Sequence, residues 1–343
     1  MSRRVTSQDV ADLAGVSRTT VSFVLNNVHR FSIRPETADK VRLAAKELGY
    51  YPNASAKALA SNQTKNVGLI LTRSPEYIAA DPFLPQILSG TLDVVKQHSL
   101  SLLVEWVEPG EQLETYLELT RAHHIDGMIL MTPRTDDTGI RALEEADIPV
   151  VVMGYIPDCT LHSVDVDNFS AARTAVEHLV SLGHRQIACI TNAALPYTSA
   201  AQRLSGYRQA LEDGGIPYDP ALVREGDFEG KSGYSQMKTL LESGKKFSAA
   251  FVASDAVALG AYTAIREAGL IIPDDISIVG FDDLPLSSLI TPSLTTVRMP
   301  AREIAQASCF LLMRLMKWEL PESRMVSLPT ELIIRESTRK LEN

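Results

Sequence analysis

The feature that most constrains the fold is an alternation of short apolar runs with amphipathic stretches of helical periodicity, which begins at Val67. This pattern is typical of parallel sheets covered by helices. Residues 66–343 are more than one open sheet usually holds, so we expect an α/β core of two lobes, each a parallel sheet covered by helices, with a ligand cleft between them. The runs are VGLIL (67–71), SLLVE (101–105), GMILM (127–131), VVVMG (150–154), IACI (187–190), AAFVA (249–253) and ISIVGF (276–281).

The first 50 residues have a different pattern, that of three short helices. Thr6, with Asp9 three positions later, matches a capping box, and Ser17 suits the N-cap of the second helix. Gly15 suits the turn between these helices, and Pro35 suits the first position of the third. The expected inward faces are Val10, Leu13 and Ala14, then Val21, Val24 and Leu25, then Val41, Ala45 and Leu48.

Charge is divided unequally along the chain. The net charge is −9, but residues 1–65 hold ten Lys and Arg against five Asp and Glu, a net of +5. The remaining residues hold 23 against 37, a net of −14. A basic segment can bind phosphate, and an acidic core would repel DNA. We therefore expect the contact with nucleic acid to be confined to the N-terminal end.

The second helix presents small polar side chains that would allow it to enter a major groove. The sequence VTSQDVADLAGVSRTTVSFVLNN joins two short helices by a tight turn, and Arg18 can reach O6 and N7 of guanine. A generic helical hairpin is the alternative interpretation, which the outward polar face and the charge division disfavour. The outward residues are Ser17, Arg18, Thr19, Thr20, Ser22 and Asn26.

Other classes of protein lack support in the sequence. The three cysteines are far apart, and no motif for metal binding or catalysis is present, so neither a cofactor nor an enzymatic activity is expected. GDFEGKS (226–232) is one residue short of a phosphate-binding loop. The N-terminus is unlike a signal peptide and no run is long enough to span a membrane, so we expect a cytoplasmic protein without membrane contact. A solute-binding protein for transport, the alternative with the same kind of core, would need a signal peptide and would have no N-terminal DNA-binding helices, and neither condition is met.

Several segments together resemble the lactose-repressor (LacI-type) family. The resemblance is carried by DVADLAGVSRTTVSFVLN, RPETADKVRLAAKELGYYPN and AKALASNQTKNVGLIL, and downstream by RLSGYRQAL, REGDF, ASDAVALGAYTAIREAGLIIPDDISIVGFDD and TPSLTTV. It covers nearly the whole chain. It implies a transcriptional regulator, here a repressor, that binds a palindromic operator in double-stranded DNA and responds to a small effector. Members are dimers or tetramers, and we expect a homodimer because no heptad extension follows ESTRKLEN.

The resemblance also implies which residues bind DNA. Arg18 and Thr19 occupy base-reading positions, and Phe23 stands where members often carry a basic residue, so its role is open. Phosphate-contacting or supporting positions are Thr6, Ser7, Ser17, Thr20 and Asn26. Residues 51–66 are small and polar, which fits a flexible linker or a helix that forms only with a partner. The family's hinge helix matches Asn53 to Ala60 and includes Ala56, Lys57 and Leu59, with Leu59 at the minor-groove wedge.

For the effector, the resemblance implies Arg203 and Asp282 as polar contacts and Phe228 as an aromatic wall. A guanidinium and a carboxylate can bind vicinal hydroxyls or the edge of a ring. Further candidates are Phe83, Tyr197, Ser199 and Asp255, while Gly154 stands where some members place a polar contact. A sugar is the expected effector. A purine sensor, or a core that only dimerises, remains an alternative, and whether the effector releases or recruits DNA binding is open.

The expected domains follow from the same resemblance. Residues 1–52 form an all-α helix-turn-helix headpiece, residues 53–65 a hinge helix and linker, and residues 66–343 the effector-binding and dimerisation core. Lobe 1 is expected at about 66–163 and 294–326, and lobe 2 at about 164–293 and 327–343.

Overall fold

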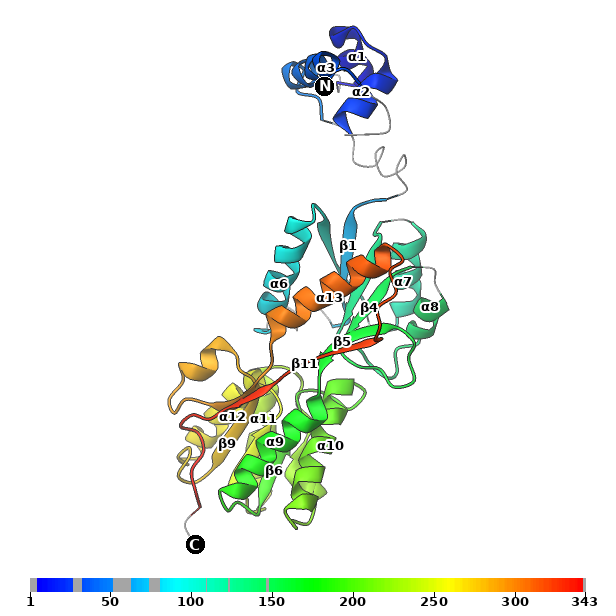
Figure 1. The fold of residues 1–343 in the computed structure, drawn as a ribbon. Coiled ribbons are helices and arrows are strands. Elements are labelled where there is room, and N and C mark those ends of the chain that lie inside the picture. Colours follow the sequence, from blue (N-terminus) through cyan, green and yellow to red (C-terminus); the bar gives the residue numbers. More distant parts are fainter. Residues whose placement is uncertain are drawn as a thin grey trace. The chain divides into compact units, whose positions relative to one another are not determined.

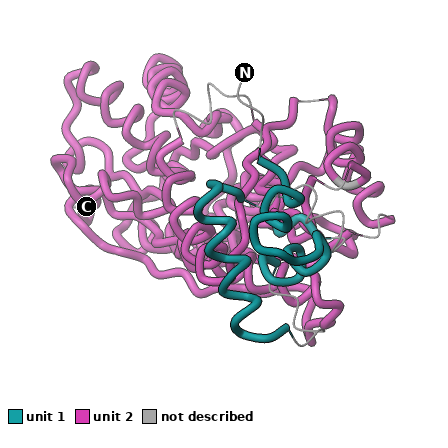
Figure 2. Tube along the Cα trace, turned by 90° about the horizontal axis from the view of Figure 1, so that it is seen from above, with its two compact units in different colours: residues 1–65 teal, residues 66–343 magenta. Residues whose placement is uncertain are grey.

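A computed structural model gives the fold of the chain (Figure 1). It describes residues 5–26, 33–51, 63–73, 81–108, 110–122, 124–145 and 148–341. The chain separates into two compact units, residues 1–65 and residues 66–343, which Figure 2 distinguishes by colour. Each unit has its own core, and each is considered by itself below.

The first unit contains three helices, α1 (Ser7–Ala14), α2 (Arg18–Leu25) and α3 (Pro35–Glu47). The predicted capping box is present: the Thr6 amide donates to Asp9 Oδ2 at 2.8 Å, and the Asp9 amide donates to Thr6 Oγ1 at 3.4 Å. Gly15 has φ 66°, a conformation that costs glycine little, and it ends α1. Ser17 Oγ accepts from the Thr20 amide at 3.1 Å and so caps α2.

One expected core position in this unit is wrong. Leu13 is 50% exposed, whereas Ala11, which the pattern did not single out, is fully buried beside Val10. Because each helical residue turns by about 100°, the face that packs on α2 and α3 is centred among Val10, Ala11 and Ala14, and Leu13 falls outside it. The rest of the core is close to expectation, with Val21, Val24, Val41, Ala44 and Ala45 buried.

Lobe 1 of the second unit contains a parallel sheet covered on both faces (Figure 1). Its helices α6 (Leu84–Gln97) and α13 (Ala301–Met316) enclose one apolar core, while α7 (Gln112–Arg121) and α8 (Ile140–Glu145) enclose the other. The strands, in order across the sheet, are β11 (Met325–Leu328), β5 (His162–Val166), β4 (Val150–Met153), β3 (Gly127–Met131), β1 (Asn66–Leu71) and β2 (Ser101–Trp106).

Lobe 2 repeats this architecture with a second sheet, in which β12 alone runs antiparallel to its neighbour. One face carries α9 (Asn168–Ser181) and α10 (Thr198–Asp213), and the other carries α11 (Gly230–Glu242) and α12 (Asp255–Glu267). The strands, in order, are β12 (Glu331–Ile333), β10 (Thr295–Arg298), β9 (Ser277–Asp282), β8 (Ala249–Val252), β6 (Ile187–Ile190) and β7 (Val223–Arg224).

Within residues 148–341 the chain passes between the lobes three times: after β5, between β10 and α13, and between β11 and β12. The boundaries expected near residues 163, 293 and 326 are therefore displaced by a few residues. The displacement has a physical reason, since backbone pairing joins residues 162–164 of β5 to β4, residues 163–166 of β5 to all of β11, and all of β10 to β9. The three passages bring the carboxyl ends of both sheets to a shared cleft.

Candidate functional sites

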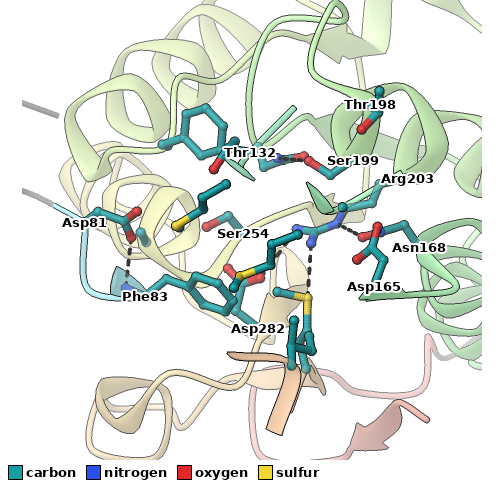
Figure 3. Close-up of a pocket in the computed structure, with 18 of the residues that line it drawn as sticks. Asp81, Phe83, Thr132, Asp165, Asn168, Thr198, Ser199, Arg203, Ser254 and Asp282 are labelled. Atoms are coloured by element: carbon teal, nitrogen blue, oxygen red, sulfur yellow. Dashed lines mark hydrogen bonds and ion pairs between the residues drawn. The ribbon is translucent and has the colours of Figure 1, made fainter. Parts of the chain in front are cut away.

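A cavity of about 790 Å³, partly open to solvent, lies between the two lobes. Its wall is built largely from residues at the carboxyl ends of the strands (Figure 3), as the general rule for parallel sheets requires. From lobe 1 these are Arg73, Thr132, Pro133, Gly154 and Asp165, and from lobe 2 they are Asn192, Ser254, Asp282 and Met299.

Arg203, which projects from α10 into this wall, is only 4% exposed and is held on several sides (Figure 3). Its Nε donates to Asn168 Oδ1 at 2.9 Å, and its Nη1 donates to the Ala253 carbonyl at 2.7 Å and lies 3.4 Å from Asp282 Oδ1. The guanidinium also lies over the Phe281 ring, 3.7 Å from its centroid. Among the described residues, Nη2 makes only a sulfur contact, to Met299 at 3.7 Å. The protein therefore fixes Arg203 and leaves Nη2 available to a ligand.

Asp282 ends β9 with φ 115°, and its carboxyl lines the cavity next to Arg203. Asp255 lies behind it and is fully buried. The Asp255 carboxylate accepts from the Leu284 amide at 2.9 Å, from Ser287 Oγ at 2.5 Å and from Thr296 Oγ1 at 2.6 Å. Burial raises the pKa values of both carboxyls; repulsion from Asp282 adds to the effect at Asp255, and repulsion from Asp81 adds to it at Asp282. Asp255 thus holds the loop after β9 and does not line the cavity, contrary to the expectation that it faces a ligand.

Four side chains stack across the cleft in an alternation of charge and ring. The Arg73 guanidinium lies 4.2 Å from the Phe228 centroid, and Phe228 meets Tyr197 edge to face at 5.0 Å. The Arg134 guanidinium lies 4.6 Å from the Tyr197 centroid. Both arginines belong to lobe 1 and both rings to lobe 2. We call this set the cross-cleft stack; it is reinforced by the Thr135 amide, which donates to the Pro196 carbonyl at 2.9 Å.

The remaining expected effector residues lie at the same cavity. Phe83 and Ser199 line it, and Ser199 Oγ accepts from Asn192 Nδ2 at 3.2 Å. Gly154 lines it as well, and a Cβ there would meet Pro133 at 2.5 Å, so no side chain projects from this position. Of the effector residues expected from the sequence, the structure thus brings Arg203, Asp282, Phe228, Phe83, Tyr197 and Ser199 together and sets Asp255 apart.

Several polar residues at the cavity were not anticipated: Arg73, Asp81, Asp165, Asn168, Asn192 and Ser254. Three of them, Arg73, Asn192 and Ser254, come within two residues after an apolar run, so the rule about carboxyl ends could have found them. Asp165 carried no such signal, because its strand HSVDV has polar residues at alternate positions. Asp165 Oδ2 accepts from Asn168 Nδ2 at 3.1 Å and thereby connects lobe 1 to Arg203.

The polar face of α2 is exposed as the sequence predicts. Arg18, Thr19 and Ser22 are exposed, while Phe23 is half-buried. Arg18 Nε donates to Ser7 Oγ at 2.9 Å, a contact that orients the guanidinium from α1. Asn26 Nδ2 donates to Ser22 Oγ at 3.2 Å. Asn53, Ala56, Lys57 and Leu59, expected in a hinge helix, lie outside the described residues.

Among the described residues, no group of three or more His, Cys, Asp or Glu side chains is arranged to hold a metal ion. None of the described helices has the length and apolar character needed to cross a membrane.

Both units match known protein families. Residues 6–53 match the family model for bacterial regulatory proteins of the lacI family, and residues 176–338 match a periplasmic binding protein-like domain. The HTH-type transcriptional regulator CelR of Thermobifida fusca is 34% identical over 98% of both chains.

Solved structures agree with the family model. The lac repressor dimer bound to operator and the anti-inducer ONPF aligns with a TM-score of 0.88 at 33% identity, covering 98% of this chain and all of that one. The complex of the transcriptional regulator CelR with cellobiose aligns with a TM-score of 0.76 at 33% identity, covering 97% and all of the respective chains. With a helix-turn-helix headpiece and a two-lobed α/β core, this chain belongs to the lacI family and is a DNA-binding transcriptional regulator.

Proposed function

We propose that the chain is a cytoplasmic, homodimeric repressor without enzymatic activity, and that a sugar bound in the cleft sets its affinity for a palindromic operator. The observation that carries this proposal is the cavity between the lobes, where polar and aromatic side chains converge. The complex of CelR with cellobiose supports a sugar as the effector, and the lac repressor dimer on its operator supports binding of operator DNA by a dimer.

The chemistry of the cavity favours a sugar. Arg203 and Asp282 offer a donor and an acceptor side by side, which suits neighbouring hydroxyl groups. Phe83 gives an apolar wall for the face of a sugar ring. A purine would prefer stacking on an open aromatic face, but in this structure Arg73 covers one face of Phe228 and Tyr197 meets the ring edge to face. The sugar is therefore the better fit.

The DNA contacts are proposed to come from the headpiece and the hinge. Arg18 and Thr19 read bases, and the phosphate-contacting or supporting residues are Thr6, Ser7, Ser17, Thr20 and Asn26. Asn53, Ala56, Lys57 and Leu59 act in the hinge. The exposed α2 face and the net charge of +5 in residues 1–65 support this assignment.

The test compares two headpiece variants on an operator selected from random DNA by the purified chain. Arg18→Ala should cost roughly 1–3 kcal/mol at one base position in each half-site and little on unrelated DNA, since it removes a base contact. Arg42→Ala removes the same charge from an exposed position on α3, where Arg42 pairs with Asp39 at 3.0 Å, so it should weaken all DNA binding slightly and evenly.

A thermal-shift screen of the same protein against sugars and nucleobases tests the effector. A sugar at 100 times its Kd should add about 2.7 kcal/mol of stability. If Arg18→Ala lowers affinity evenly for all DNA, the recognition assignment is wrong; if only nucleobases stabilise the protein, the sugar assignment is wrong.

A further inference from the structure

Carboxylates outnumber guanidiniums around the cavity. Among the described residues, two positive side chains line the cavity, Arg73 and Arg203. Three negative ones line it as well, Asp81, Asp165 and Asp282. Asp255 adds a fourth buried carboxyl directly behind Asp282. With its lining groups ionised, the cavity therefore has a net charge of −1 before any ligand enters.

The positive charge of each guanidinium is already matched by a carboxylate, although N–H groups of both remain free to donate to a ligand. Arg203 pairs with Asp282, and the two side chains are 5% and 9% exposed. Arg73 pairs with Asp81, and these side chains are 7% and 8% exposed. Both ion pairs are thus removed from water, where the attraction within each pair is strong and a third, unmatched charge is costly. An anionic group would have to compete with a carboxylate that is already in place.

Asp165 is the carboxylate without a matching cation. It is 8% exposed, and among the described residues it makes no ion pair. Its Oδ1 accepts from the Val166 amide at 2.8 Å and its Oδ2 accepts from Asn168 Nδ2. These donors are neutral, so the negative charge of Asp165 remains to act on a ligand.

Arg73 is the residue at which a change in the charge of the cavity lining would affect a ligand most directly. Its Nη1 is buried and has no hydrogen-bond partner among the described residues, while its Nη2 is held by Asp81. A buried donor without a partner is unfavourable, so a ligand oxygen that reached Nη1 would be bound well. Asp81 also accepts from the Phe83 amide through Oδ1 at 2.8 Å, a bond that an asparagine could keep.

We propose that the cleft selects an uncharged effector and rejects sugars that carry a phosphate or carboxylate, and that Asp81 determines this specificity by neutralising Arg73. The inference rests on the proposed function, because it concerns the sugar of that same cleft. It narrows the class of effector to neutral polyhydroxylated molecules, whose oxygen atoms can reach Arg73 Nη1 without adding charge.

The experiment measures binding of matched pairs of sugars to the full-length chain by calorimetry. Each neutral sugar that binds in a screen of mono- and disaccharides is compared with its anionic form; cellobiose with cellobionate, and glucose with glucose 6-phosphate, are the first pairs. The wild-type chain should bind the anionic member at least tenfold more weakly. Asp81→Asn should raise the affinity for the anionic member relative to the neutral member at least tenfold.

Two further variants are the controls. Asp227→Asn removes the same charge from an exposed position beside Phe228 that does not line the cavity, and it should change anion affinity by less than twofold. The double variant Arg73→Met with Asp81→Asn leaves no lone buried guanidinium that could impair folding. It should still reject anions, because the two negative charges of Asp165 and Asp282 still outnumber the one positive charge of Arg203.

The outcomes separate this inference from the proposed function. If anionic sugars bind the wild-type chain as tightly as neutral ones, or if only anionic sugars bind, the inference is overturned while the sugar-sensing role stands. Acceptance of anions by the double variant would also overturn it. If no sugar of either kind binds, the proposed function itself fails, and the inference fails with it.

Discussion

At the scale of single residues, Asp165 shows how the cavity holds charge away from water. Burial raises the pKa of this carboxyl to about 6, and the hydrogen bond from the Val166 amide, the attraction of Arg203 and the hydrogen bond from Asn168 only partly offset that effect. A carboxyl with a raised pKa binds its proton more tightly in the folded state than in the unfolded one. Its ionisation therefore opposes folding above pH 6, and this cost disappears as the pH falls below about 4.

This linkage gives a prediction for Asp165→Asn. Between pH 4.5 and pH 7.5 the wild-type chain should lose stability relative to the variant by on the order of 2 kcal/mol, because only the wild-type chain must ionise this group. The measurement is urea unfolding of both chains across that range, with the difference in unfolding free energy plotted against pH. A difference that stays constant with pH would show that Asp165 titrates normally, whatever the absolute stability of the variant.

At the scale of elements, α11 and α12 approach each other through glycines. A Cβ at Gly260 would lie 1.7 Å from the Gly230 carbonyl oxygen, and one at Gly233 would lie 1.9 Å from the Val257 carbonyl oxygen. Backbone atoms cannot move aside as a side chain can, so the two helices pack at a distance that admits no side chain at these positions.

Gly260→Ala should accordingly destabilise the core by roughly 1–3 kcal/mol or more, despite the higher helix propensity of alanine. Gly230→Ala is the matched control on the same helix pair, since a Cβ there would lie 3.3 Å from the nearest atom, and it should have a much smaller effect. Chemical unfolding of the two variants tests this. If Gly260→Ala and Gly230→Ala had equal free energies of unfolding, α11 and α12 could move apart to admit the methyl group without loss of stability.

The elements also show how far sequence reasoning reaches. All seven apolar runs are strands. Six of them are buried almost throughout, which leaves a clear pattern in the sequence, while β2 is a partly exposed edge strand that is still largely apolar. Strands β5, β7, β10, β11 and β12 are not among these runs: HSVDV and TTVR contain polar residues, and β7, β11 and β12 lie at the edges of their sheets, where MVSL is largely exposed. At the cavity, Arg203 and Asp282 followed from the resemblance. The pairing of Arg73 with Asp81 did not, since it depends on the tertiary fold.

At the scale of the whole core, the cross-cleft stack holds the lobes together in this structure. Each cation–π contact is worth about 0.5–2 kcal/mol, so two of them can shift the balance between closed and open lobes substantially. Arg134, at one end of the stack, is partly exposed and is absent from the cavity wall. Its contribution to closure can therefore be separated from ligand contact.

Arg134→Met should increase the open fraction of the ligand-free core several-fold, because it removes the cation over Tyr197. Distances between spin labels, one in each lobe of the full-length chain, would report this change. Arg208→Met is the control, since Arg208 lies 4.6 Å from the Tyr218 centroid within lobe 2, the same separation as in the Arg134 pair. A distance distribution that is identical in wild type and Arg134→Met would show that the stack does not hold the cleft closed.

The three passages of the chain between the lobes have a consequence for synthesis on the ribosome. The core of lobe 1 includes Ile304, Ala305, Leu311, Leu312 and Leu315 of α13, and β11 forms one edge of its sheet. None of these residues exists until more than 300 have been translated, so one face of the lobe 1 sheet lacks its second helix while the strands of lobe 2 emerge. Lobe 2 then lacks the short edge strand β12 and the C-terminal segment after it, whose Ser337 bonds to Ile278 and Thr295. The lobe that begins first is thus completed late, and its exposed apolar face is a surface that chaperones would meet on the nascent chain.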